Sequence, residues 1–88
     1  MIIKVNKEAR SKRFKNAVDD VINELIEAGQ MGIRLVTRPP VRGENYKSKD
    51  LIRAVEEKTE GSVRGWIGDK TLTIHFVIKE YNNEDLFS

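Results

Sequence analysis

Arginines, lysines and one tryptophan are the residues of this chain whose types and spacing best suit a chemistry, namely contact with phosphates and bases. Guanidinium and ammonium groups release counterions from phosphates, and a flat indole ring stacks on an unpaired base whatever its identity. The candidates are Lys4, Arg34, Arg38, Arg42, Lys47, Lys49, Arg64, Trp66 and Lys70. Whether they share a surface depends on the elements that carry them.

Catalytic patterns are weaker. The chain has no cysteine, which excludes disulfides, thiol nucleophiles and cysteine-ligated metals. His75 is the only histidine, and a lone histidine is more typical of a hydrogen-bonded strand residue than of a metal ligand. Asp19-Asp20 and Glu56-Glu57 are helix neighbours that point about 100° apart, so neither pair can act jointly. We therefore expect no enzyme, no cofactor and no metal.

Size and charge limit the remaining classes. A chain of 88 residues supports one small core, predicted to be a domain over residues 1–79 with an acidic tail at 80–88. No apolar run approaches the roughly 20 residues that span a bilayer, so we expect a cytoplasmic protein without a membrane partner. The net charge of +2 is segregated: residues 1–16 sum to +5, residues 17–33 to −4 and residues 34–53 to +4. The distribution of charge along the chain, more than the net charge, determines which partners it attracts.

Two amphipathic helices are expected. The first carries one apolar stripe, begins after Asn6 or Ser11, and is capped by Gly29. The stripe consists of Phe14, Ala17, Val18, Val21, Ile22, Leu25 and Ala28. The second starts with Ser48 as N-cap and ends near Gly61.

Four strands complete the expected fold. Ile2, Ile3 and Val5 form the first, residues 31–37 the second, and a hairpin turning at Gly68-Asp69 the last two. That turn pairs Val63 with Ile74 and places Leu72 on the core face. The sequence thus predicts an α+β domain of two layers in the order β-α-β-α-β-β, with a four-stranded mixed sheet and two helices on one face.

The uncovered face of this sheet is the predicted site. If Ile33 and Leu35 face the helices, then Lys4, Arg34, Val36 and Arg38 face the other way, beside Arg64, Trp66 and His75. A basic, aromatic face next to a basic loop predicts a nucleic-acid-binding protein, for DNA or RNA, that is largely independent of sequence. Two alternatives stay open: a protein-interaction module that docks through this face, and a homodimer in contact through Trp66 and Val36.

The acidic tail is a separate signal, because it ends in two large apolar residues. It either folds back onto the domain or acts as a short docking motif. Asp85, Leu86 and Phe87 resemble the core of the peptide by which bacterial replication proteins bind the sliding clamp, although asparagine stands where that motif has glutamine. A clamp or another replication protein is therefore a candidate partner.

The element order and the basic hairpin resemble the fold of the Alba chromatin proteins and of the C-terminal domain of translation initiation factor 3. The resemblance covers residues 1–79. It implies nucleic-acid contacts from Arg38, Arg42, Lys47 and Lys49 in the loop and from Arg64, Trp66 and Lys70 in the hairpin, usually within a homodimer. Pro39-Pro40 departs from the Alba pattern.

Overall fold

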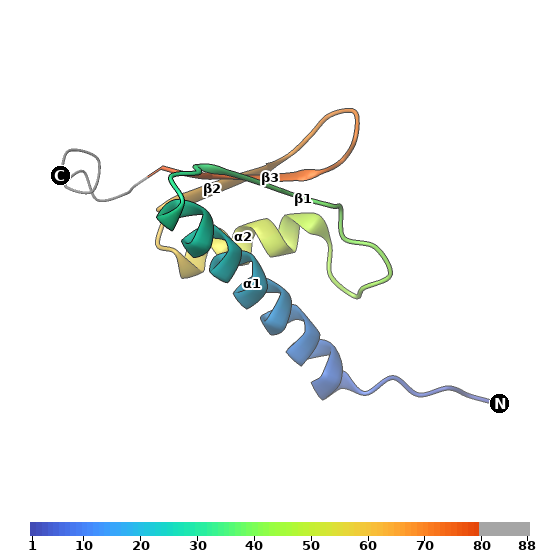
Figure 1. Ribbon diagram of the computed structural model, residues 1–88. Helices are drawn as coiled ribbons and strands as arrows, with labels where there is room; N and C mark the ends of the chain where they lie inside the picture. Colours follow the sequence, from blue (N-terminus) through green and yellow to red (C-terminus); the bar gives the residue numbers. More distant parts are fainter. Residues whose placement is uncertain (80–88) are drawn as a thin grey trace.

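The computed structural model describes residues 1–79 and shows an α+β fold with two helices and a three-stranded antiparallel sheet (Figure 1). Along the chain the elements are α1 (Lys7–Gln30), β1 (Leu35–Arg38), α2 (Ser48–Lys58), β2 (Val63–Ile67) and β3 (Ile74–Ile78). The spatial strand order is β1-β3-β2, so β1 and β2 are the edge strands. Both helices lie on the same side of the sheet, α1 against β1 and α2 against β2.

α1 begins after Asn6, which is one of the two predicted N-caps. The Asn6 side-chain oxygen accepts a hydrogen bond from the Ala9 N–H at 3.1 Å, which satisfies one of the free donors of the first turn. The predicted cap at Gly29 is wrong, because the helix continues to Gln30. The residue that leaves the helix in a left-handed conformation is Gly32, at φ 77°, and the Ile33 N–H then donates back to the Ala28 carbonyl at 2.8 Å.

α2 begins one residue earlier than the prediction, which made Ser48 the N-cap. Lys47 is the N-cap, and its N–H donates to the Asp50 carboxylate at 2.8 Å. Ser48 instead uses its hydroxyl to accept from the Val41 N–H at 3.1 Å, which ties the preceding loop to the helix. The helix ends at Lys58, short of Gly61, and buries Leu51, Ile52 and Val55.

The loop between β2 and β3 is longer than the two-residue turn predicted at Gly68-Asp69. Val63 pairs with Ile78 and Ile67 with Ile74, so residues 68–73 form the connection. The Gly68 N–H donates to the Thr73 carbonyl at 2.8 Å, which closes this loop. The register differs from the predicted one by four residues, an even number, and each strand therefore keeps its predicted face. Leu72 is the exception, because it lies in the loop, exposed, at φ 57°.

The core lies between the sheet and both helices. Phe76 and Ile74 of β3 are fully buried, together with Val21 of α1 and Val55 of α2. Gly65 of β2 is paired with Phe76, and a Cβ at Gly65 would lie 3.0 Å from the Phe76 ring and 2.9 Å from the Ile52 side chain. The close approach of α2 to the sheet therefore requires glycine at this position.

Two strand predictions are wrong. Residues 2–5 form no strand: Ile2, Ile3 and Val5 are exposed and extend away from the domain ahead of α1 (Figure 1). A strand needs a neighbour to pair with, and the start of α1 lies far from the sheet. The observed sheet therefore has three strands, all antiparallel, rather than four in a mixed sheet.

The second wrong prediction is the orientation of β1. Val36 is 6% exposed and faces the helices, whereas Leu35 is 49% exposed and faces away. Leu35 and Val36 are both apolar, so the local pattern allows either orientation. The pairing of Val36 with Phe76 and the ion pair of Arg38 with Glu24 on α1 decide between them.

Candidate functional site

On the uncovered sheet face, His75 of β3 is paired with Trp66 of β2 on one side and with Thr37 of β1 on the other. Trp66 is paired with His75, and their rings stack with centroids 5.3 Å apart and planes 16° apart. His75 is held by two hydroxyls: Thr37 Oγ1 lies 3.3 Å from its Nδ1 and Thr73 Oγ1 lies 3.1 Å from its Nε2. These contacts agree with its reading as a hydrogen-bonded strand residue. Trp66 remains 46% exposed, so one part of the indole is free to meet a partner.

Most of the predicted cations do not join Trp66 on this face. Arg38 is ion-paired with Glu24 on the helix side of the sheet. The Arg34 guanidinium donates to the Ile78 carbonyl at 3.3 Å. Lys4 lies in the extended segment before α1. Among the strand residues of the described chain, only Arg64 therefore places a cation beside Trp66, and the inverted orientation of β1 is the reason.

The same inversion removes the predicted dimer contact between Trp66 and Val36. Val36 is buried against α1, whereas Leu35 and Val77 share the outer face with Trp66 and Arg64. This face is thus more apolar than basic.

The remaining predicted cations lie on loops and on the start of α2. Arg42 belongs to the connection between β1 and α2, Lys47 and Lys49 flank the first residue of α2, and Lys70 lies in the loop between β2 and β3. All four are exposed. Their exposure suits contact with a large ligand, but no strand holds them in place.

A different group of cations is assembled by contacts between α1 and the loop before α2. The Phe14 and Tyr46 rings meet edge to face at 4.9 Å, and Arg13 is ion-paired with Glu44. We call this region, residues 7–15 and 42–50, the basic end. It contains eight basic and three acidic residues. The basic ones are Lys7, Arg10, Lys12, Arg13, Lys15, Arg42, Lys47 and Lys49.

The Arg13–Glu44 pair shifts the pKa of each of its two members. The hydrogen bond from the Arg13 guanidinium lowers the pKa of Glu44 below its ordinary value of 4.5. The same bond raises the pKa of Arg13. The pKa of Tyr46, whose ring contacts Phe14, is raised mainly by desolvation. The pair stays charged at neutral pH and links the loop to the helix.

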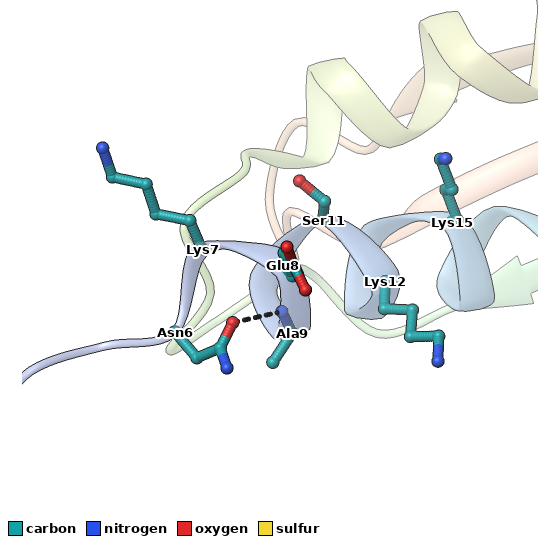
Figure 2. A pocket seen from close by; sticks show the side chains of 7 residues that line it. All are labelled: Asn6, Lys7, Glu8, Ala9, Ser11, Lys12 and Lys15. Carbon is teal, nitrogen blue, oxygen red and sulfur yellow. Dashed lines mark hydrogen bonds between the residues drawn. The ribbon is translucent and has the colours of Figure 1, made fainter.

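The first turns of α1 project their lysines in several directions (Figure 2). Lys7 and Lys15 lie on one side of the helix and Lys12 on the opposite side. The pocket that these residues line is formed by α1 and its N-cap only, so it is a shallow surface feature and does not enclose a small molecule. The arrangement presents charge to an extended polyanion.

Sequence reasoning missed the five cations of α1 as site residues. The signal was present in the charge of +5 over residues 1–16. Nothing in the sequence pattern separated the first half of α1, residues 7–15, from the second half, whose exposed side is acidic. Asp19, Asp20, Glu24 and Glu27 occupy that second half, where Asp19 pairs with Lys58 at 2.6 Å.

The described residues also bear on metal-ion clusters and membrane spans. Residues 1–79 contain no group of three or more histidine, aspartate or glutamate side chains placed to hold a metal ion. Within the same residues, neither helix has the length and apolar character needed to cross a membrane. The predicted docking residues Asp85, Leu86 and Phe87 lie outside the described residues.

Comparisons with protein-family models, with curated proteins and with solved structures find no match to this chain. The Alba-like resemblance stays a prediction. The first strand that it requires is not part of the observed sheet.

Proposed function

We propose that this protein binds nucleic acid through the basic end, by contacts with phosphates and without reading the base sequence. The observation that carries the proposal is the assembly of eight basic residues by the Phe14–Tyr46 and Arg13–Glu44 contacts. Phosphate contacts supply affinity that is independent of sequence and depends steeply on salt. The acidic second half of α1 repels a polyanion and so limits the contact to one end of the molecule.

The test is binding of fluorescein-labelled oligonucleotides, single-stranded and duplex, followed by anisotropy over a series of salt concentrations. About four neutralised phosphates give a slope of roughly −3 to −4 in log K against log salt. Lys12→Glu with Lys15→Glu should weaken binding by at least about tenfold and make the slope shallower. Lys79→Glu, a single reversal of an exposed residue after β3, is the control and should change binding much less. Salt-independent affinity would contradict the proposal.

Trp66 provides an internal probe of where the ligand binds. It is the only tryptophan, and it lies on the outer sheet face rather than at the basic end. Binding at the basic end should leave its emission nearly unchanged. Strong quenching would instead place the ligand on the sheet face with Arg64.

One observation favours a second candidate, a protein partner on the outer sheet face. Among the described strand residues, Leu35, Trp66 and Val77 share this face with one cation, Arg64, which is the composition of a protein interface more than of a phosphate site. Capture of a protein that survives nuclease treatment and is lost with Trp66→Ala, but not with Lys12→Glu, would support this reading.

A further inference from the structure

The two edges of the sheet differ in how they are protected. In β2 the outward backbone groups belong to Val63, Gly65 and Ile67, because Ser62 and Gly68 bond to Lys79 and Thr73, the residues that flank β3. The Gly65 N–H is already taken by the Glu56 carboxylate of α2 at 3.2 Å. A side chain of α2 thus closes this edge to another strand.

The edge of β1 is open in the described part of the chain. The Ile78 N–H donates to the Arg34 carbonyl at 2.8 Å, so the alternation of an antiparallel pair turns the backbone groups of Leu35 and Thr37 outward. A groove runs along this edge between β1 and the second half of α1. Most of the residues that line it are apolar, and Glu24, Glu27 and Thr37 are the polar ones; the apolar ones are Ala28, Met31, Ile33, Leu35 and Val36. We call this the β1 groove.

A segment that fits the β1 groove exists in the same chain. Residues 1–5, the N-terminal arm, are extended and leave the domain without packing on it (Figure 1). Ile2 is 89%, Ile3 83% and Val5 62% exposed, and Lys4 stands between them. Exposed apolar residues in an extended arm are costly to leave in water and are suited to pairing with a sheet edge.

The arm does not reach the β1 groove of its own molecule. Glu24 is the groove residue nearest to the arm along α1, eighteen residues after Asn6, which is about 27 Å at 1.5 Å per residue. Five extended residues span at most about 17 Å. In a second copy whose α1 ran antiparallel to the first, the N-terminal end of each α1 would lie near the groove end of the other.

We propose that the β1 groove binds the N-terminal arm of a second copy of this chain, so that each copy supplies a fourth strand to its partner's sheet. Ile3 and Val5 then lie beside Leu35 on the outer face, and Lys4 faces Glu27, which has no ion pair among residues 1–79. The proposal is independent of the nucleic-acid function. It also explains why residues 2–5 have a strand pattern but no strand in the single chain.

The first test is the mass of the full chain in solution over a range of concentrations, by sedimentation equilibrium. A dimer is expected, and Ile3→Asp should raise its dissociation constant by about tenfold or more, because the apolar contact with Leu35 would be lost and a carboxylate would lie in its place. Asn45→Asp carries the same change of charge on an exposed loop and should leave the dimer intact. A chain that stays monomeric, or a dimer that tolerates Ile3→Asp, overturns the proposal.

The second test identifies the contact. The chain has no cysteine, so Ile3→Cys and Leu35→Cys introduce the only thiols. Under mild oxidation, a mixture of the two single variants should give a covalent dimer containing one chain of each. Absence of this species overturns the proposal, as does an intramolecular disulfide in the double variant, which would mean that the arm folds back on its own groove. A native fold of each variant, checked by circular dichroism, is the control.

Discussion

The two halves of α1 belong to one helix, but one half packs against the core and the other is mostly charged and exposed. Residues 18–28 bury Val18, Val21, Leu25 and Ala28 against the sheet and α2. Residues 7–15 carry five cations, and Phe14 is the one apolar side chain among them that packs against the described core. A helix therefore docks only as far as its apolar stripe runs. Beyond that point it is stabilised by its N-cap and a few side-chain contacts and presents its charge to solvent.

Loss of a buried ring in the docked region should have the largest effect. Phe76→Ala removes a fully buried side chain from β3 and leaves a cavity between both helices. We expect the free energy of unfolding to fall by about 3–5 kcal/mol, measured by urea denaturation. For so small a domain that is a large part of the total. A loss below about 1 kcal/mol would contradict the central place of β3 in the core.

A smaller loss is expected when the ring at the basic end is removed. Phe14 is partly buried and contacts Tyr46, so Phe14→Ala should cost about 1–2 kcal/mol. The amides of residues 7–13 should exchange faster with solvent, while those of residues 18–28 keep their protection, as hydrogen exchange followed by NMR would report. Equal acceleration in both halves would show that α1 behaves as one cooperative unit and break the comparison.

The smallest effect concerns the ion pair of the basic end. The pKa of Glu44 is lowered in the folded protein, so the stabilising contribution of the pair is present above the unfolded pKa and is lost as the pH falls through the folded one. We expect the Glu44 carboxyl to titrate below 4.5 in an NMR titration. Arg13→Gln should move that midpoint upward while the core stays folded. An unchanged midpoint would show that Arg13 does not hold the loop.

The parts of the fold that sequence predicted are those with a strong local signal. The apolar stripe of α1 runs over four turns, and Asn6 is one of the two N-caps that local residue type predicted. The faces of β2 and β3 were also predicted, although their register was not, because an error of four residues preserves the alternation of a strand. The prediction that Trp66 lies on the uncovered face is correct for this reason.

The placement of the cations could not be predicted in the same way. The faces of Arg34 and Arg38 depended on the orientation of β1, and two adjacent apolar residues left that orientation undecided. The cations of α1 became a site only through Phe14–Tyr46 and Arg13–Glu44, which join residues about thirty positions apart. No local pattern contains that information.

The sequence by itself determined two amphipathic helices, a hairpin and a strongly segregated charge, because each depends on residues a few positions apart. Only the tertiary structure decided which face of β1 is buried, which cations gather at the basic end, and that residues 2–5 pair with no strand among residues 1–79. These outcomes depend on contacts between distant elements and on the length of α1, which holds the N-terminal arm beyond the reach of the sheet.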